Sequence, residues 1–179
     1  MGIKTEDGKV ITDPKELATY MNNFFKEKVV KLQATLKVDR EAVEDYAREY
    51  MTDKGYETPP EFSFKTVGTG AISKTIRSLK NTGAQGRDEI STKILKQFRG
   101  VISASLRHII NLSITTGTYP DGWKCGIVTP IPKSGDLSLP KNWRPVVINP
   151  STSKVLEGVL QAQLQDHMEE KDIFSPSQH

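Results

Sequence analysis

The N-terminal part of the chain opens with the pattern of a helix start. In the segment TDPKE, residues 12–16, Asp13 can cap free backbone N–H groups and Pro14 suits the first helical position. Glu16 completes a capping-box pattern. An apolar stripe at helical spacing follows: Leu17, Met21, Phe24 and Phe25. The pattern therefore predicts a helix that runs to about residue 32.

Helical periodicity returns in five further stretches. It predicts a second, acidic helix at residues 40–51 and further helices at residues 71–80, 92–98, 102–114 and from about 151 or 152 onward. The last of these carries an apolar ladder with four-residue steps: Leu156, Leu160, Leu164 and Met168. The polar residues 53–61 are the best candidate for a linker.

Two short stretches rich in β-branched residues and prolines, residues 125–132 and 143–148, predict strands. Pro130 and Pro132 are two positions apart, so both lack an N–H on the same side, as in an edge strand. If the two strands pair as a hairpin with Lys133 opposite Arg144, most other pairs on that face are apolar. A further strand is expected around residues 62–67.

These elements predict an α+β chain that is mostly helical and contains a two-strand ribbon. The 179 residues suffice for one domain with a core or for a piece of a larger one. No apolar run approaches the roughly 20 residues of a membrane span, and the N-terminus does not look like a signal peptide. The single Cys125 cannot form an internal disulfide, which favours a reducing, intracellular location. The three histidines are scattered, so no transition-metal set is recognisable.

Charge is distributed unevenly along the chain. Residues 1–62 carry 10 Lys and Arg against 13 Asp and Glu, and residues 155–179 carry 1 against 5. Residues 63–154 carry 14 against 4, a net charge of +10. Such a basic segment attracts polyanions in a salt-dependent way, although lysines on solvated helix faces would give the same count.

Lys133 and Arg144 flank the polar loop of the predicted hairpin, and Asp136 is the one acidic residue between them. Like charges that face each other across a ribbon repel, and an anion bound between them would reverse that repulsion. A triphosphate or a nucleic-acid backbone suits the pair, because lysine offers a point charge and arginine a forked donor. Alternatively, Lys133 and Arg144 bind no anion and simply point into water at the tip of the hairpin.

The segment GTGAISKT, residues 68–75, is close to a phosphate-binding P-loop. However, Ser73 stands where the motif has its second glycine, and no later apolar strand ends in an aspartate that could hold magnesium. A helix start near Thr69 or Gly70 is the better interpretation of this segment.

Several segments in order resemble the first half of the reverse transcriptases of non-LTR retrotransposons. They are GKVITDPKELATYMNNFF, LKNTGAQGRDEISTKILK, TGTYPDGWK, WKCGIVTPIPKSGD, NWRPVVI, TSKVLEGVLQAQLQDHM and SPSQH. The first is similar to the connector that precedes the polymerase, and the others are similar to the fingers and the start of the palm. The resemblance divides the chain into a helical connector, residues 1–60, and fingers with partial palm, residues 61–179.

The resemblance implies roles for individual residues. Lys133 and Arg144 would contact the triphosphate of an incoming dNTP, and Lys124 and Lys141 would touch the template backbone. Trp143 would pack beneath the ribbon.

The resemblance also assigns Gly86 and Asp88 to the turn before the helix at Thr92. This sequence departs from the family there, with Gln85 where proline is usual and Glu89 where glycine is usual. These two departures put the usual geometry of the turn in question.

Polymerisation in this family requires Mg²⁺ held by aspartates, which lie downstream of the box that begins with Gln178 and His179. No Asp-Asp pair occurs in the chain, so we expect no catalytic and no metal-binding residues in it and no polymerase activity from it alone.

Two functions therefore remain open. The chain is either a fragment of an RNA-directed DNA polymerase that contacts RNA template, DNA primer and dNTP, or a non-catalytic helical module derived from a mobile element. The second would bind nucleic acid or protein through the basic segment, including Lys74, Arg77, Lys93 and Lys96. In either case, we expect the first 50 residues to pack loosely against the rest of the chain. We also expect the ladder on the last helix to be exposed and to promote self-association.

Overall fold

The computed structural model describes residues 2–36, 40–53, 55, 62–171 and 173–174. The chain forms two compact units: residues 1–59 with 128–147 (the first unit), and residues 60–127 with 148–179 (the second unit). Both helices and strands are present, which confirms the mixed α+β class. The division between a connector and a polymerase segment near residue 60 stays a prediction. The proposed linker lies largely outside the described residues.

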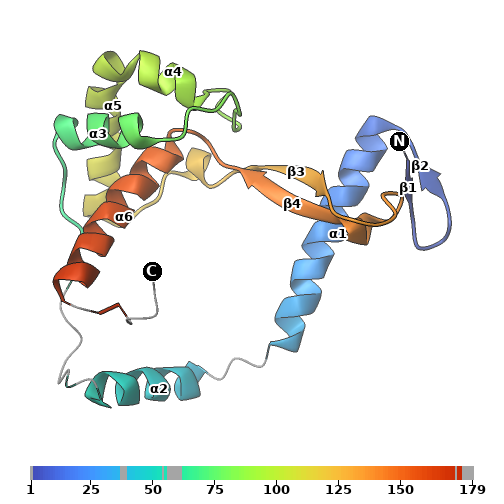
Figure 1. Ribbon diagram of the computed structural model, residues 1–179, viewed down its shortest axis with the longest axis horizontal. Helices are drawn as coiled ribbons and strands as arrows, with labels where there is room; N and C mark the ends of the chain where they lie inside the picture. The colour runs from blue at the N-terminus through green and yellow to red at the C-terminus, as the bar shows by residue number, and fades with distance from the viewer. Residues whose placement is uncertain (1, 37–39, 54, 56–61, 172, 175–179) are drawn as a thin grey trace. The chain divides into compact units, whose positions relative to one another are not determined.

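The first unit begins with a small hairpin that the sequence did not reveal. Strand β1 (Ile3–Lys4) pairs with β2 (Val10–Ile11) in antiparallel fashion, with Ile3 facing Ile11 (Figure 1). The helices α1 (Pro14–Thr35) and α2 (Arg40–Asp53) follow. Both helices were predicted from the sequence.

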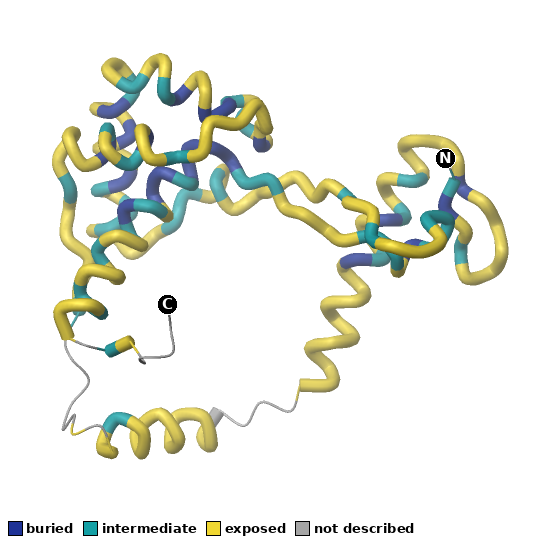
Figure 2. Tube along the Cα trace, viewed as in Figure 1, coloured by how far each residue is buried: buried dark blue, intermediate teal, exposed yellow. Residues whose placement is uncertain are grey.

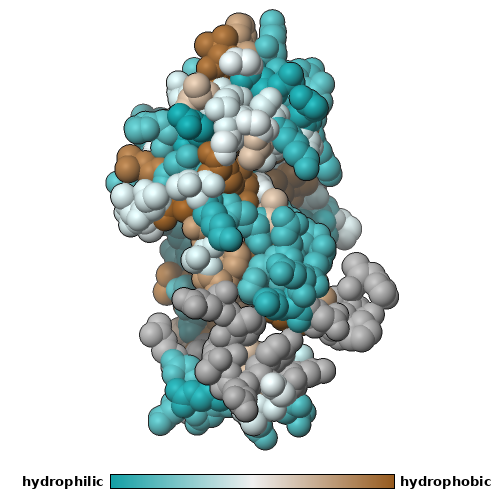
Figure 3. Space-filling view, turned by 90° about the vertical axis from the view of Figure 1, so that its left-hand side faces the viewer, coloured by the Kyte–Doolittle hydropathy of each residue, from teal (hydrophilic) through white to brown (hydrophobic). Residues whose placement is uncertain are grey.

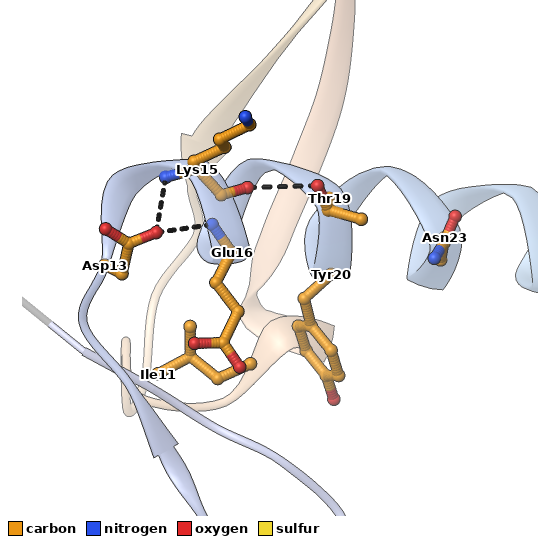
Figure 4. Close-up of a pocket in the computed structure, with 7 residues that line it drawn as sticks. All are labelled: Ile11, Asp13, Lys15, Glu16, Thr19, Tyr20 and Asn23. Carbon is orange, nitrogen blue, oxygen red and sulfur yellow. Dashed lines mark hydrogen bonds between the residues drawn. The ribbon is translucent and has the colours of Figure 1, made fainter.

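Helix α1 begins as its sequence predicts. The Asp13 carboxylate accepts hydrogen bonds from the backbone N–H groups of Lys15 (3.1 Å) and Glu16 (2.8 Å), and Pro14 occupies the first turn (Figure 4). The predicted capping box is confirmed for Asp13 but not for Glu16. The Glu16 carboxylate accepts from the Lys9 ammonium group at 2.6 Å, so this side chain ties the helix to the β1–β2 hairpin.

A small apolar core holds the first unit together. Ile3, Met21 and Phe25 are buried in one cluster, and Trp143, far away in the sequence, packs against it. The Lys4 backbone N–H also donates to the Ser138 carbonyl at 2.7 Å. The expectation of loose packing is therefore wrong for β1 and the first half of α1, because these elements share a core with the segment around Trp143.

The second unit is a helical assembly. It contains α3 (Thr69–Ser78), α4 (Thr92–Gln97), α5 (Arg99–Thr116), the 3₁₀ turn η1 (Asp121–Trp123) and α6 (Ser153–Glu170), which confirms the predicted helices. One cluster of buried side chains joins the four α-helices (Figure 2). Its members are Ile72, Ile76, Leu95, Leu106, Ile110, Val155, Leu156 and Val159.

The apolar ladder of α6 is exposed only in its second half. Leu156 is fully buried and Leu160 packs against the core, whereas Leu164 is 42% exposed. The prediction of an exposed ladder is thus wrong for its first half, because α3 contributes Ile72 and Ile76 to the cluster that covers it.

The segment at residues 62–68 is not a strand, contrary to expectation. Its backbone is paired with side chains instead. The Gln163 carboxamide accepts from the Lys65 N–H (2.8 Å) and donates to the Lys65 carbonyl (2.9 Å). The Asn111 carboxamide likewise accepts from the Val67 N–H (2.8 Å) and donates to the Val67 carbonyl (3.0 Å). Each carboxamide thus satisfies one donor and one acceptor as a neighbouring strand would, which fastens the segment to α5 and α6.

Thr92 and Ser91 organise the loop between α3 and α4. The buried Thr92 hydroxyl accepts from the Thr82 N–H at 2.9 Å and donates to the Lys80 carbonyl at 2.8 Å. The Ser91 hydroxyl caps α4 by accepting from the Ile94 N–H at 3.3 Å. Ser91 and Thr92, which start α4, therefore fix the C-terminal end of this loop.

The turn inside this loop approaches the start of α6 very closely. Gly86 is buried, and a Cβ atom there would lie 2.7 Å from the backbone N and Cα of Pro150. Asp88 accepts hydrogen bonds from the Ile90 N–H and the Thr152 hydroxyl, both at 3.2 Å. Glycine at position 86 is thus a steric requirement, and the Asp88 carboxylate lies next to the N-terminal end of α6, where negative charge is favourable.

Glu89 has a φ angle of +55°, in the left-handed region. Among the described residues it is the only non-glycine with positive φ. Glycine is what the family resemblance leads us to expect at this position. The turn therefore keeps the backbone geometry that suits glycine, with a side chain that makes this geometry unfavourable.

We predict that Glu89→Gly stabilises the protein, because glycine adopts positive φ without the steric penalty of a Cβ. The gain in the free energy of unfolding should be about 1 kcal/mol, measured by urea denaturation. Glu89→Ala, which removes the carboxylate but keeps the Cβ, is the matched control and should not reproduce the gain. Equal effects of the two substitutions would show that the side-chain charge matters rather than the backbone.

We also predict that Gln163→Leu destabilises the protein by about 1–2 kcal/mol, since it removes two hydrogen bonds to the Lys65 backbone. Gln161→Leu, an equivalent change at an exposed position of α6, should alter the unfolding free energy by less than about 0.5 kcal/mol. Both values come from denaturation curves recorded under identical conditions. A Gln163 variant as stable as the Gln161 variant would contradict the proposed role of the carboxamide.

Candidate anion-binding site

The two predicted strands form an antiparallel ribbon, β3 (Ile127–Pro132) and β4 (Trp143–Ile148) (Figure 1). The Lys133 N–H donates to the Asn142 carbonyl at 2.8 Å. This bond and the matching strand bounds indicate that Lys133 faces Asn142 and that Ile131 faces Arg144. The expected register, with Lys133 opposite Arg144, is therefore wrong by two residues.

The prolines of the ribbon agree with this register. Pro130, Pro132 and Pro145 all fall at positions where the backbone nitrogen points away from the partner strand. Their missing N–H groups thus leave the ladder intact and instead remove donors from the outer edges. This supports the edge-strand prediction for β3 and disfavours the addition of further strands.

Lys133 and Arg144 lie on the same face of the ribbon, because a shift of two residues preserves the alternation of side chains. They are diagonal neighbours, whose Cβ atoms are typically about 7–8 Å apart. Ile131 and Val146 share this face and are 43% and 40% exposed. Lys133 is half-buried and Arg144 is exposed, and their neighbours on this face are the apolar Ile131 and Val146 together with the polar Asn142.

No acidic side chain neutralises these cations within the described part of the chain. The ion pairs found there involve neither Lys133 nor Arg144. Lys133 makes one long hydrogen bond, in which its ammonium group donates to the Lys141 carbonyl at 3.4 Å. Asp136 is engaged elsewhere: its carboxylate accepts from the Ser138 N–H at 2.9 Å, and this bond lowers the pKa of Asp136.

The loop that joins the strands has a defined internal structure. The Asn142 amide donates to the Asp136 carbonyl at 2.7 Å, and the Trp143 indole N–H donates to the Leu137 carbonyl at 3.1 Å. The buried Pro140 begins the 3₁₀ turn η2 (Pro140–Asn142). The loop therefore fixes the backbone from which the Lys133 and Arg144 side chains extend. Asn142 was not recognised from the sequence, because a single loop asparagine carries no periodic signal.

The two weaker template-contact candidates have different surroundings. The exposed Lys141 lies in η2, and its carbonyl accepts the Lys133 hydrogen bond, so it belongs to the same loop. Lys124 belongs to the second unit and donates to Asp121 at 2.7 Å. That bond lowers the pKa of Asp121. The structure therefore groups Lys141, and not Lys124, with Lys133 and Arg144.

The basic residues of α3 and α4 form a separate set in the second unit. Lys74 and Arg77 are exposed on α3, and Lys93 is exposed on α4, where Lys96 is half-buried. None of the four takes part in an ion pair with another described residue. These side chains are available to a polyanion as well.

A surface hollow of about 510 Å³ runs along the first turns of α1 (Figure 4). Its two carboxylates are already used, by the helix cap at Asp13 and the Lys9 pair at Glu16. Among the described residues, no group of three or more His, Cys, Asp and Glu side chains is placed to hold a metal ion. Within the same residues, no helix is long and apolar enough to cross a bilayer.

Comparison with known proteins connects the chain to mobile elements. Over 107 residues it is 35% identical to the retrovirus-related Pol polyprotein from type-1 retrotransposable element R2 of Popillia japonica, a match that covers 60% of this chain and 14% of that protein. It is 22% identical over 107 residues to the transposon TX1 uncharacterized 149 kDa protein of Xenopus laevis, covering 60% of this chain and 8% of that protein.

No family model matches the chain. The two matches nevertheless confirm the resemblance carried by the motifs: the chain is similar to part of two retrotransposon polyproteins and spans only a small share of their length.

Proposed function

We propose that this chain is the part of a retrotransposon reverse transcriptase, with that enzyme's fingers and partial-palm fold, that contacts the RNA template, the DNA primer and the incoming dNTP. In this proposal, Lys133 and Arg144 bind the triphosphate and Lys141 contacts the nucleic-acid backbone beside them. The carrying observation is that two cations share one face of a fixed ribbon and have no acidic partner among the described residues.

The chemistry of the two residues supports a phosphate ligand. Arg144 can present two parallel N–H donors to two phosphate oxygens, and Lys133 can place a compact charge on a neighbouring phosphate. The fixed loop reduces the ordering cost of binding, because the backbone of both residues is already held.

The Mg²⁺ that such a polymerase requires does not fit the described residues of this chain, since no three or more of their His, Cys, Asp and Glu side chains are grouped to hold a metal ion. We therefore assign no catalytic step to them. The chain is proposed to bind and position substrates, and purified protein is expected not to incorporate nucleotides.

A second function has its own supporting observation. Lys74, Arg77, Lys93 and Lys96 lie on the second unit without ion-pair partners among the described residues. A helical module that binds nucleic acid or protein would use these residues and would not need the hairpin. Apolar side chains also reach the surface among hydrophilic ones (Figure 3), so self-association is expected under either proposal.

The test compares two double variants that remove the same charge. Lys133→Ala with Arg144→Ala removes the hairpin pair, and Lys74→Ala with Arg77→Ala removes a lysine and an arginine from α3. We expect the first to weaken binding of a fluorescent dNTP analogue by about tenfold or more, since charge-assisted hydrogen bonds are lost. The α3 variant should bind the nucleotide almost as well as the unchanged protein.

Fluorescence anisotropy at two salt concentrations gives these affinities, and circular dichroism verifies that each variant is folded. Arg144→Lys adds a finer control, because it keeps the charge but loses the forked donor and should give an intermediate affinity. If the hairpin variant binds normally while the α3 variant loses nucleic-acid binding, the module function replaces the first proposal.

A further inference from the structure

The apolar face of α1 continues beyond the part of the helix that is buried. Met21 and Phe25 are in the core of the first unit, but Val29 and Leu32 follow on the same face and are 54% and 55% exposed. Steps of four, four and three residues keep these side chains in one stripe. The second half of α1 is exposed (Figure 2), so Val29 and Leu32 present apolar side chains to solvent there.

Helix α2 presents a matching stripe. Val43, Tyr46 and Tyr50 are separated by steps of three and four residues and are 57%, 70% and 47% exposed. Large apolar and aromatic side chains that repeat along one helix face indicate a surface that packs against something. The opposite face of α2 is rich in charge, including Arg48, which pairs with Glu44 and Asp45.

The two stripes are mirror images in the sequence. From Phe25 the α1 stripe advances by four residues to Val29 and by three to Leu32. Read backward from Tyr50, the α2 stripe also advances by four residues and then by three. An antiparallel pair of helices therefore places Val29 opposite Tyr46 and Leu32 opposite Val43 at the same time.

The connection between the helices suits this arrangement. Helix α1 ends at Thr35 and α2 begins at Arg40, so four residues, 36–39, join them. Connections of two to five residues are typical of antiparallel helix pairs.

The net charges favour α2, rather than a second copy of α1, as the helix that packs against the apolar stripe of α1. Residues 26–35 of α1 hold three lysines and one glutamate, 3 − 1 = +2, whereas α2 holds two arginines and five acidic residues, 2 − 5 = −3. At the edge of the stripes, Lys28 of α1 and Glu49 of α2 lie on the same side of the antiparallel pair. Two copies of α1 would instead bring like charges together.

We propose that α2 folds back onto the second half of α1 and forms an antiparallel helical hairpin, which covers Val29 and Leu32 and extends the core that begins at Met21 and Phe25. The inference does not depend on nucleotide binding. It assigns the apolar stripe of α1 to a segment of the same chain.

A disulfide test measures this contact directly. In a Cys125→Ser background, which removes the exposed native thiol, the pair Val29→Cys with Tyr46→Cys tests the facing positions. The matched pair Glu27→Cys with Arg48→Cys lies at the same level of the hairpin but on the outer faces. We expect the inner pair to form an intrachain disulfide about tenfold faster than the outer pair, as followed on non-reducing gels and by mass spectrometry.

The alternatives give different outcomes. Equal rates for the two pairs would overturn the proposal, and disulfides formed mainly between chains would assign the stripe to a second copy. Adding Leu32→Glu to the inner pair should reduce its rate toward that of the outer pair, because the charge weakens the apolar contact. An unchanged rate in that variant would also contradict the proposal. Loss of dNTP binding with normal crosslinking, or the reverse, separates this inference from the proposed function.

Discussion

The packing of Trp143 against Ile3, Met21 and Phe25 is the interaction on which the candidate site depends. The core of the first unit is small, so one indole ring supplies a large share of its apolar contact area. The same residue starts β4 and donates from its indole nitrogen to the Leu137 carbonyl. The ring therefore connects the N-terminal elements to the loop that carries Lys133, and the position of the cations is determined by residues more than one hundred positions earlier in the sequence.

The second unit has a comparable constraint at the turn next to α6. Gly86 allows the turn to meet the Pro150 backbone, and Asp88 joins it to Thr152. Glu89 retains a left-handed conformation inside this arrangement. The surrounding contacts determine the shape of the turn strongly enough to overcome an unsuitable residue, which explains how the helical unit keeps its geometry where the sequence departs from the family pattern.

Sequence reasoning succeeded where the signal is local and failed where distant segments meet. The cap at Asp13 and the strand that begins at Trp143 follow from neighbouring residues and were predicted. The ribbon register was not, because the 3₁₀ turn at Pro140 shortens the loop in a way that alternation cannot reveal. The strand expected near Lys65 does not form, because the backbone of Lys65 is hydrogen-bonded by a side-chain carboxamide 98 positions away in the sequence. Periodicity identifies which face of α6 is apolar, but it does not show how much of that face α3 covers.

The distribution of charge suggests that affinity and selectivity for a polyanion arise in different places. Exposed cations on α3 and α4, which lack ion-pair partners among the described residues, can attract any phosphate backbone, and this attraction falls as salt rises. Attraction of this kind does not distinguish one phosphate arrangement from another. In the proposed function the hairpin would make this distinction, because its loop fixes a lysine and an arginine on one face. Selectivity for a triphosphate would then depend on Trp143 and the N-terminal core, although neither contacts the ligand in the proposed arrangement.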